Sequence, residues 1–141
     1  MGKSSYGFPG LRNISHTGSP THYISSNLKS IERSFGMTQS GYIAKKYKEN
    51  GATNRRTFVS KDPVDSAKRL FRTLGRGGVQ NPIKNKDGVI KGWTRTMKGG
   101  DAITYRPRES SDGSTVIDIN IISKHTPVKS QKIHFYKKEA K

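Results

Sequence analysis

The sequence predicts an α+β fold in which N-terminal helices pack on a twisted antiparallel β-sheet of about four strands. Two observations carry this prediction. The run at 62–75 has the apolar spacing of an amphipathic helix, and later segments between about 88 and 138 alternate apolar and polar residues between turn signals. Strands that follow one another with short links pair as an antiparallel meander, and the helix before them covers one face.

The chain divides into an arm and one domain. Residues 1–25 are rich in glycine, proline, serine and threonine and lack apolar periodicity, so we expect a flexible or irregular arm there. The remaining residues, 26–141, are expected to form a single domain, with its helices within about 26–75 and its sheet at about 88–138. The length of 141 residues fits one such domain.

Two short runs precede the main helix. In the first, Ser26 or Asn27 can cap a helix and Gly36 can end it. Its apolar residues recur at helical spacing: Leu28, Ile31 and Phe35. The second run, 40–51, is a candidate for one or two further helical turns.

The main helix is predicted over 62–75. Asp62 suits the N-cap, Pro63 the first helical position and Gly75 the C-terminal stop. The apolar residues fall on one stripe: Val64, Ala67, Leu70, Phe71 and Leu74. Lysines and arginines lie off this stripe, either as a solvated face or as phosphate contacts, and we take Arg72 and Arg76 as candidate RNA-binding residues.

Four strand-like segments follow. Turn signals at Gly99-Gly100 and at 111–114 separate the first three, and a looser connection with Pro127 leads to the fourth. The segments are VIKGWTRTMK, DAITYRPRES, TVIDINIIS and QKIHFYKK.

Alternation sorts their side chains onto two faces. The apolar face is the expected core, and it takes Ile103, Tyr105, Ile117, Ile119, Ile121, Ile133 and Phe135. The other face is polar and cationic and holds a single histidine. Its predicted members are Thr104, Arg106, Arg108, Asp118, Asn120, Lys132 and His134.

The composition indicates an anionic partner. Lysine and arginine number 27 against 10 acidic residues, a formal net charge of +17. Such a charge repels itself in the compact state and is usually neutralised by phosphates. No run approaches the roughly 18 apolar residues of a membrane span, so none is expected. Cysteine is absent and the acidic residues are scattered, so neither a metal site nor a small-molecule cofactor is expected.

The polar face has the groups that RNA cleavage without a metal requires. The 2′-hydroxyl of RNA attacks the adjacent phosphorus, which needs proton transfer and cations for the phosphoryl charge. His134 can move the proton, while Arg106, Arg108 and Lys132 can hold the phosphate. Asp118 can orient the histidine.

Each of these residues also has a simpler explanation. His134 can be an ordinary hydrogen-bonded strand residue, and arginines on an exposed strand can merely confer solubility. Three aromatic residues can stack on unpaired bases, although the first two of them can equally pack in the core: Trp93, Tyr105 and Tyr136.

The segments ITYRPRESSDGSTVIDINI and QKIHFYKK resemble the closing strands of the barnase/EndoU/colicin/RelE group of ribonucleases, as found in the C-terminal toxin domains of contact-dependent inhibition and related polymorphic toxin systems. The resemblance covers roughly the last 80 residues. It implies N-terminal helices on a four-stranded antiparallel sheet that cleaves RNA without a metal, often tRNA in or near the anticodon loop. Catalytic residues vary within this group, so it assigns positions rather than roles, and these are Thr104, Arg106, Ser110, Lys132 and His134.

The resemblance also implies partners and a place of action. Such toxins are encoded beside an immunity protein, which for a domain of charge +17 is expected to be acidic and to cover the basic face. The domain would be delivered as the C-terminus of a larger exported protein and act in the cytoplasm of a target cell. The competing reading is a non-catalytic RNA-binding or ribosome-associated module, which accounts for the charge equally well but gives His134 no special role.

Overall fold

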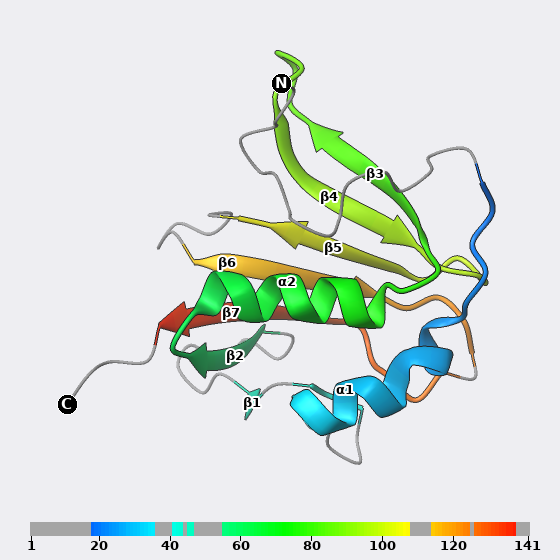
Figure 1. Cartoon of the computed structure of the whole chain (residues 1–141), viewed down its shortest axis with the longest axis horizontal. Coiled ribbons are helices and arrows are strands. Elements are labelled where there is room, and N and C mark those ends of the chain that lie inside the picture. Colours follow the sequence, from blue (N-terminus) through cyan, green and yellow to red (C-terminus); the bar gives the residue numbers. More distant parts are fainter. Residues whose placement is uncertain are drawn as a thin grey trace.

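A computed structural model describes residues 18–35, 41–43, 45–46, 55–107, 114–124 and 126–137. Within these ranges the chain forms a 3₁₀ turn, two α-helices and seven strands that join in one sheet (Figure 1). In chain order the elements are η1 (Ile24–Asn27), α1 (Leu28–Ser34), β1 (Lys45–Lys46), β2 (Arg55–Ser60), α2 (Pro63–Leu74), β3 (Val79–Lys84), β4 (Ile90–Thr96), β5 (Ala102–Arg106), β6 (Thr115–Asn120) and β7 (Gln131–Lys137).

The strand order in the sheet is β1-β2-β7-β6-β5-β4-β3. Strands β3 to β7 pair antiparallel in chain order, and they include the four segments that the alternation predicts. Beyond β7 the pattern changes, because β2 pairs with β7 in parallel and β1 pairs antiparallel with β2.

The predicted fold class is therefore wrong in two respects. The sheet is mixed and larger than four strands, and the helices do not all precede it, because α2 lies between β2 and β3 in the chain. Parallel neighbours require a crossover connection. Here the connection from β2 to β7 consists of α2 and four antiparallel strands, so the N-terminal part of the chain supplies strands as well as helices.

Strands β2 and β3 were not predicted, and each has a local reason. Strand β2 begins with two arginines, which obscure the short β-prone run that follows them. Strand β3 contains Pro82, which argues against a central strand, but β3 lies at the sheet edge with β4 as its neighbour and so tolerates a missing donor. The second helical candidate is also wrong where it is described, since Gly41–Ile43 is not helical and Lys45–Lys46 forms β1.

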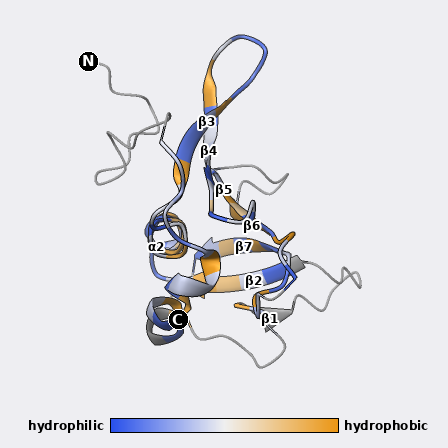
Figure 2. Ribbon diagram, turned by 90° about the vertical axis from the view of Figure 1, so that its right-hand side faces the viewer, coloured by the Kyte–Doolittle hydropathy of each residue, from blue (hydrophilic) through white to orange (hydrophobic). Residues whose placement is uncertain are grey.

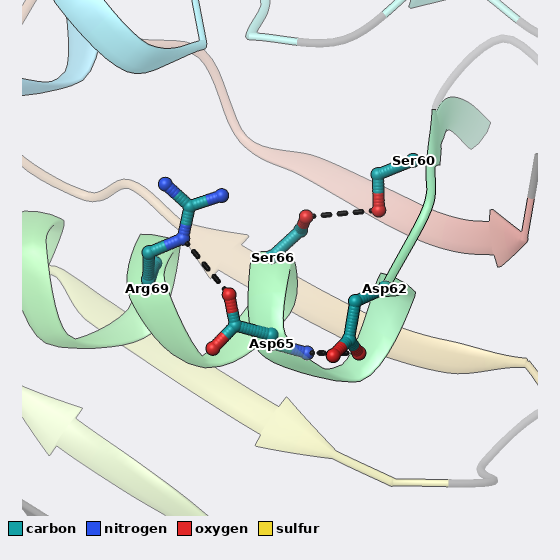
Figure 3. Close-up of polar contacts among 5 residues, drawn as sticks. All are labelled: Ser60, Asp62, Asp65, Ser66 and Arg69. Atoms are coloured by element: carbon teal, nitrogen blue, oxygen red, sulfur yellow. Dashed lines mark hydrogen bonds and ion pairs between the residues drawn. The ribbon is translucent and has the colours of Figure 1, made fainter.

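Helix α2 begins and ends where the sequence predicts. The side chain of Asp62 accepts a hydrogen bond of 3.0 Å from the Asp65 amide, Pro63 is the first helical residue and Gly75 is the C-cap. Figure 3 shows this cap beside the ion pair between Asp65 and Arg69, at 3.2 Å. The first turn is also tied to β2, because the Ser66 hydroxyl donates to Ser60 Oγ at 2.9 Å.

The hydrophobic core lies between α2 and one face of the sheet. Both helices lie on this side, as Figure 2 shows. The helix contributes four fully buried side chains, Ala67, Leu70, Phe71 and Leu74. The strands contribute Ile103, Tyr105, Ile117, Ile119, Ile133 and Phe135. Val64, which belongs to the predicted stripe, is 42% exposed instead.

The segment before α1 is bound to the body of the domain. Ile24 is fully buried, the Thr21 amide donates to the Gly77 carbonyl at 2.8 Å, and the Lys98 amide donates to the His22 carbonyl at 2.9 Å. Asn27 occupies the N-cap position of α1, as predicted, but makes no capping bond. Its side-chain amide donates instead to the carbonyls of Leu74 and Arg76, so it joins α1 to the C-terminal end of α2.

A buried carboxylate, that of Asp101, lies at the end of the sheet opposite the link between β5 and β6. Asp101 is 1% exposed, and its Oδ1 accepts hydrogen bonds from the amides of Ile122 and Ser123 while its Oδ2 accepts one from the Ser123 hydroxyl. Burial alone would raise the pKa of Asp101, but these hydrogen bonds outweigh it and hold the pKa below its usual value. The carboxylate thus fixes the segment after β6 to the β4–β5 turn.

We predict that Asp101→Asn lowers the free energy of unfolding by about 1–2 kcal/mol at pH 7, because the bond from the Ser123 hydroxyl to a charged acceptor is lost. A lowered carboxyl pKa stabilises the fold above the unfolded value near 3.8, and this contribution disappears as the pH falls through the folded value. The difference between the two proteins should therefore shrink in acid. Urea unfolding at pH 7 and pH 3 measures it, and an equal difference at both pH values contradicts this assignment.

Candidate nucleic-acid interface

The face of the sheet opposite α2 carries polar side chains from β2, β5, β6 and β7. Strand register places them there. Side chains alternate between the two faces, so cross-strand partners share a face, and so do residues two positions apart on one strand. We call the polar face the set Thr57, Thr104, Arg106, Asp118, Lys132, His134 and Tyr136. Five of its members are on this face as the alternation predicts; Tyr136, proposed as a stacking residue, lies on the same face, and Thr57 was not foreseen.

Two rows cross the polar face. In the first, Thr104, Asp118 and Lys132 are successive partners on β5, β6 and β7. In the second, Arg106 pairs with Val116, which pairs with His134, which pairs with Thr57 of β2. Neighbouring Cβ atoms in such a row lie about 5 Å apart, so long side chains in adjacent rows can contact one phosphate group.

His134 lies in the middle of β7 and is 5% exposed. Its Nδ1 is 3.1 Å from the hydroxyl oxygen of Ser114, and its ring stacks on Tyr136 with 6.3 Å between centroids and 14° between planes. These contacts hold the imidazole in one orientation, which is the role that a partner on one ring nitrogen plays for a proton-transferring histidine.

Thr57 lies beside His134 in the parallel register between β2 and β7. Its hydroxyl oxygen is buried and has no hydrogen-bond partner among the described residues. Leaving a hydroxyl without a partner costs on the order of 1–3 kcal/mol, so such a group needs an explanation. The hydroxyl of Thr57 is therefore a buried polar group beside His134 that the described structure leaves unsatisfied.

The first row combines neutral, negative and positive groups. Thr104 and Thr94 share a hydrogen bond of 3.2 Å between their hydroxyl oxygens, which orients Thr104. Asp118 is half-buried and lies opposite the exposed Lys132, a favourable cross-strand pairing of charges. The row therefore offers one exposed ammonium group, Lys132, beside the half-buried Asp118.

The two other aromatic candidates are not on the polar face. Tyr105 is 1% exposed in the core, where it packs on Phe71 with 6.0 Å between centroids, and burial raises its pKa to about 12. Trp93 pairs with Tyr105 on the same side of the sheet and packs against the core. Both residues therefore lie on the core side of the sheet, which agrees with their alternative role as core residues and not with stacking on bases at the polar face. Tyr136 is the aromatic candidate that lies beside His134.

The remaining candidates lie elsewhere. Arg72 and Arg76 are at the C-terminal end of α2, across the sheet from the polar face. Asn120 is exposed on β6, one row beyond Asp118 and farther from His134. Arg108 and Ser110 are outside the described residues.

The sequence analysis missed Ser114 and Thr57 as site residues. Ser114 was assigned to the turn before β6, yet it is 7% exposed and contacts the histidine. Thr57 was missed because β2 was not recognised as a strand. The alternation of Thr57 and Val59 around Phe58 is a strand signal, but nothing in a single sequence indicates that β2 pairs with β7.

One buried cation is structural. Arg95 is 5% exposed, donates from Nε to the Gln80 side chain at 2.9 Å and lies with its guanidinium 5.0 Å from the Phe71 ring centre. Its Nη1 donates at 3.4 Å to the carbonyls of Arg72 and Gly75 at the end of α2, where a cation is favourable. Burial, together with the neighbouring Arg72, lowers the pKa of Arg95 to about 10.

No group of three histidine, aspartate or glutamate side chains in the described residues is placed to hold a metal ion. No helix in the same part of the chain is long and apolar enough to cross a membrane.

Comparisons with protein-family models, with curated protein sequences and with solved structures found no match to this chain.

We predict that Thr57→Val leaves the free energy of unfolding unchanged or raises it by about 1 kcal/mol, because valine removes a buried hydroxyl that makes no hydrogen bond in the described structure. Thr104→Val is the matched control on the same face. It should lose about 1 kcal/mol, since it breaks the bond to Thr94. Urea unfolding of both variants measures the contrast, and equal losses would mean that Thr57 has a partner in the native protein.

Proposed function

We propose that this chain is a metal-independent endoribonuclease whose site is the polar face around His134. One observation carries the proposal: a histidine oriented by Ser114 lies on the same face as Arg106 and Lys132, in a chain of net charge +17. A proton-transfer group and phosphate-binding cations on a common surface are the groups that cleavage by the 2′-hydroxyl needs.

The proposed reaction is an internal transesterification. The 2′-oxygen forms a bond to phosphorus, the bond from phosphorus to the 5′-oxygen breaks, and the products are a 2′,3′-cyclic phosphate and a 5′-hydroxyl. One proton leaves the 2′-hydroxyl and one reaches the 5′-oxygen. His134 transfers one of these protons through Nε2, the ring nitrogen that does not face Ser114.

The neighbouring residues have distinct proposed roles. Arg106 and Lys132 neutralise the charge that builds up on the phosphoryl oxygens. Tyr136, stacked on the imidazole, offers its ring to an unpaired base, as recognition of single-stranded RNA commonly requires. The Thr57 hydroxyl, which lacks a protein partner in the described structure, supplies a hydrogen bond to the phosphate.

The substrate and the biological setting rest on the sequence resemblance described above. We propose tRNA as the substrate and a toxin role in bacterial competition. In that setting the domain is delivered into a target cell and is neutralised in its producer by an acidic immunity protein. The fold does not contribute to this part of the proposal, because the mixed sheet differs from the sheet that the resemblance implied.

The first test is incubation of the purified chain with total bacterial RNA in EDTA, beside His134→Gln. We predict discrete fragments ending in cyclic phosphate from the wild-type chain, and a rate roughly 10²–10⁴-fold lower from the variant, the usual contribution of general acid–base catalysis. His22→Gln is the matched control, because His22 is half-buried at the far end of the sheet and should keep the wild-type rate.

Thermal unfolding separates catalysis from stability, because His134 is buried and its replacement can weaken the fold. The prediction holds if His134→Gln is folded at the assay temperature and inactive. Equal cleavage by the folded variant would remove His134 from the mechanism, and intact RNA with every protein would end the nuclease proposal.

The second candidate is a non-catalytic RNA-binding module, and the burial of His134 favours it. A histidine that is 5% exposed and hydrogen-bonded to Ser114 can have a purely structural role, in which it joins β7 to the segment before β6. In that case RNA binding should weaken gradually with each cation removed, and each should reduce the slope of log affinity against log salt by about one. His134→Gln should then bind RNA as tightly as the wild-type chain.

A further inference from the structure

The hairpin of β3 and β4 projects from the body of the domain, as Figure 2 shows. Its base is anchored, because Arg95 of β4 bonds to Gln80 of β3 and to the carbonyl of Gly75 after α2. Pairing between β4 and β5 is described from Trp93 to Thr96. The distal part of the hairpin, residues 84–91, therefore extends past the end of the β4–β5 ladder.

The turn at the tip is ordered by its own hydrogen bonds. The side-chain oxygen of Asn85 accepts from the amides of Asp87 and Val89, at 2.8 and 3.0 Å, and the Asn85 amide donates to the Val89 carbonyl at 2.9 Å. Gly88 adopts a φ of 81°, which this turn requires and which other residues rarely accept. A tip held in this way presents its side chains without needing to fold on a partner.

The tip lies at the same end of the sheet as the second row of the polar face. Gly92, just below the tip, lies against the backbone of Tyr105 and Arg106, so closely that a Cβ atom there would collide with the Tyr105 carbonyl oxygen. From Gly92 the strand continues to Ile90, roughly 7 Å at about 3.3 Å per residue, and the turn of the tip lies beyond it. An RNA segment that passes Arg106 would therefore continue alongside the hairpin.

The chemistry of the tip suits phosphate groups rather than bases. Its exposed side chains include Lys84, Lys86 and Lys91 against a single carboxylate, Asp87. Residues 84–91 contain no aromatic side chain, so they offer no platform for stacking on unpaired bases. Lysine binds phosphate as a point charge, without reading sequence.

We propose that the β3–β4 hairpin tip binds the phosphate backbone of a base-paired RNA stem, so that the substrate class of the polar face is stem-loop RNA. This inference rests on the proposed function and extends it. A stem fits the observations better than a second single strand, because A-form RNA displays its phosphates along a wide, shallow minor groove that is recognised by shape and backbone contacts. The loop of such an RNA would reach His134 while its stem lies along the hairpin.

The test compares two RNAs of identical loop sequence, one closed by a stem and one unstructured. Binding is measured with the His134→Gln protein, which keeps the RNA intact, and cleavage is measured with the wild-type chain. The variant Lys84→Gln, Lys86→Gln, Lys91→Gln removes the tip charges. Its matched control removes three exposed lysines at the opposite end of the sheet: Lys98, Lys124 and Lys129.

We expect the tip variant to lose affinity for the stem-loop RNA and to keep its affinity for the unstructured RNA. Three phosphate contacts contribute about 2.7 to the salt slope, so between 50 and 200 mM salt the parent protein should lose roughly 40-fold more affinity than the tip variant. The control triple variant should change stem-loop affinity less, and cleavage of the unstructured RNA provides the reference rate.

The outcomes separate this inference from the proposed function. If the wild-type chain cleaves both RNAs equally well and the tip variant binds the stem-loop like its parent, the hairpin inference is overturned while the nuclease proposal stands. If no RNA is cleaved but the tip variant alone loses stem-loop affinity, the stem-binding role of the hairpin stands and the nuclease proposal fails. Equal loss in the tip and control variants also overturns the inference, because binding would then reflect net charge alone.

Discussion

Four apolar side chains of α2, all fully buried, pack against the isoleucines of β5, β6 and β7. Burying one large apolar side chain contributes on the order of 1.5–3 kcal/mol, so this contact decides which face of the sheet is inside. Because side chains alternate along a strand, the same choice places Thr104, Arg106, Lys132 and His134 together on the other face. The Asp62 cap, the Ser66–Ser60 bond and the Arg95 contacts at the end of α2 all keep the helix in this position.

The parallel pairing of β2 with β7 determines the surroundings of His134. It makes β7 an interior strand, and it places Thr57 directly beside His134. His134 therefore has neighbours on both adjacent strands, and its ring contacts Ser114 before β6. Both the catalytic and the structural interpretation must account for its burial.

The parts of the fold that follow from short-range patterns were predictable. Asp62, Pro63 and Gly75 define α2 through capping chemistry, and period-two alternation is enough to assign Thr104, Asp118 and Lys132 to one face. Long-range choices were not predictable, because β2 pairs with a strand 77 positions later and no local signal records that partner. Trp93 and Tyr105 show a second limit: an aromatic residue has the same local pattern whether it faces the core or the solvent, and only the register with Ile117 decides. Asn27 shows a third, since a residue suited to capping α1 is used to join two helices.

Pro82 has a further consequence at the outer edge of β3. An edge strand presents unpaired backbone groups that can pair with the edge of another molecule and start aggregation. Proline has no amide hydrogen, so it interrupts that row of donors near the middle of the strand, and exposed Asn81 and Lys84 flank it. The projecting hairpin is thereby protected from edge-to-edge pairing with another copy of the chain. The same irregular edge that hides β3 from sequence-based recognition keeps neighbouring copies from extending the sheet.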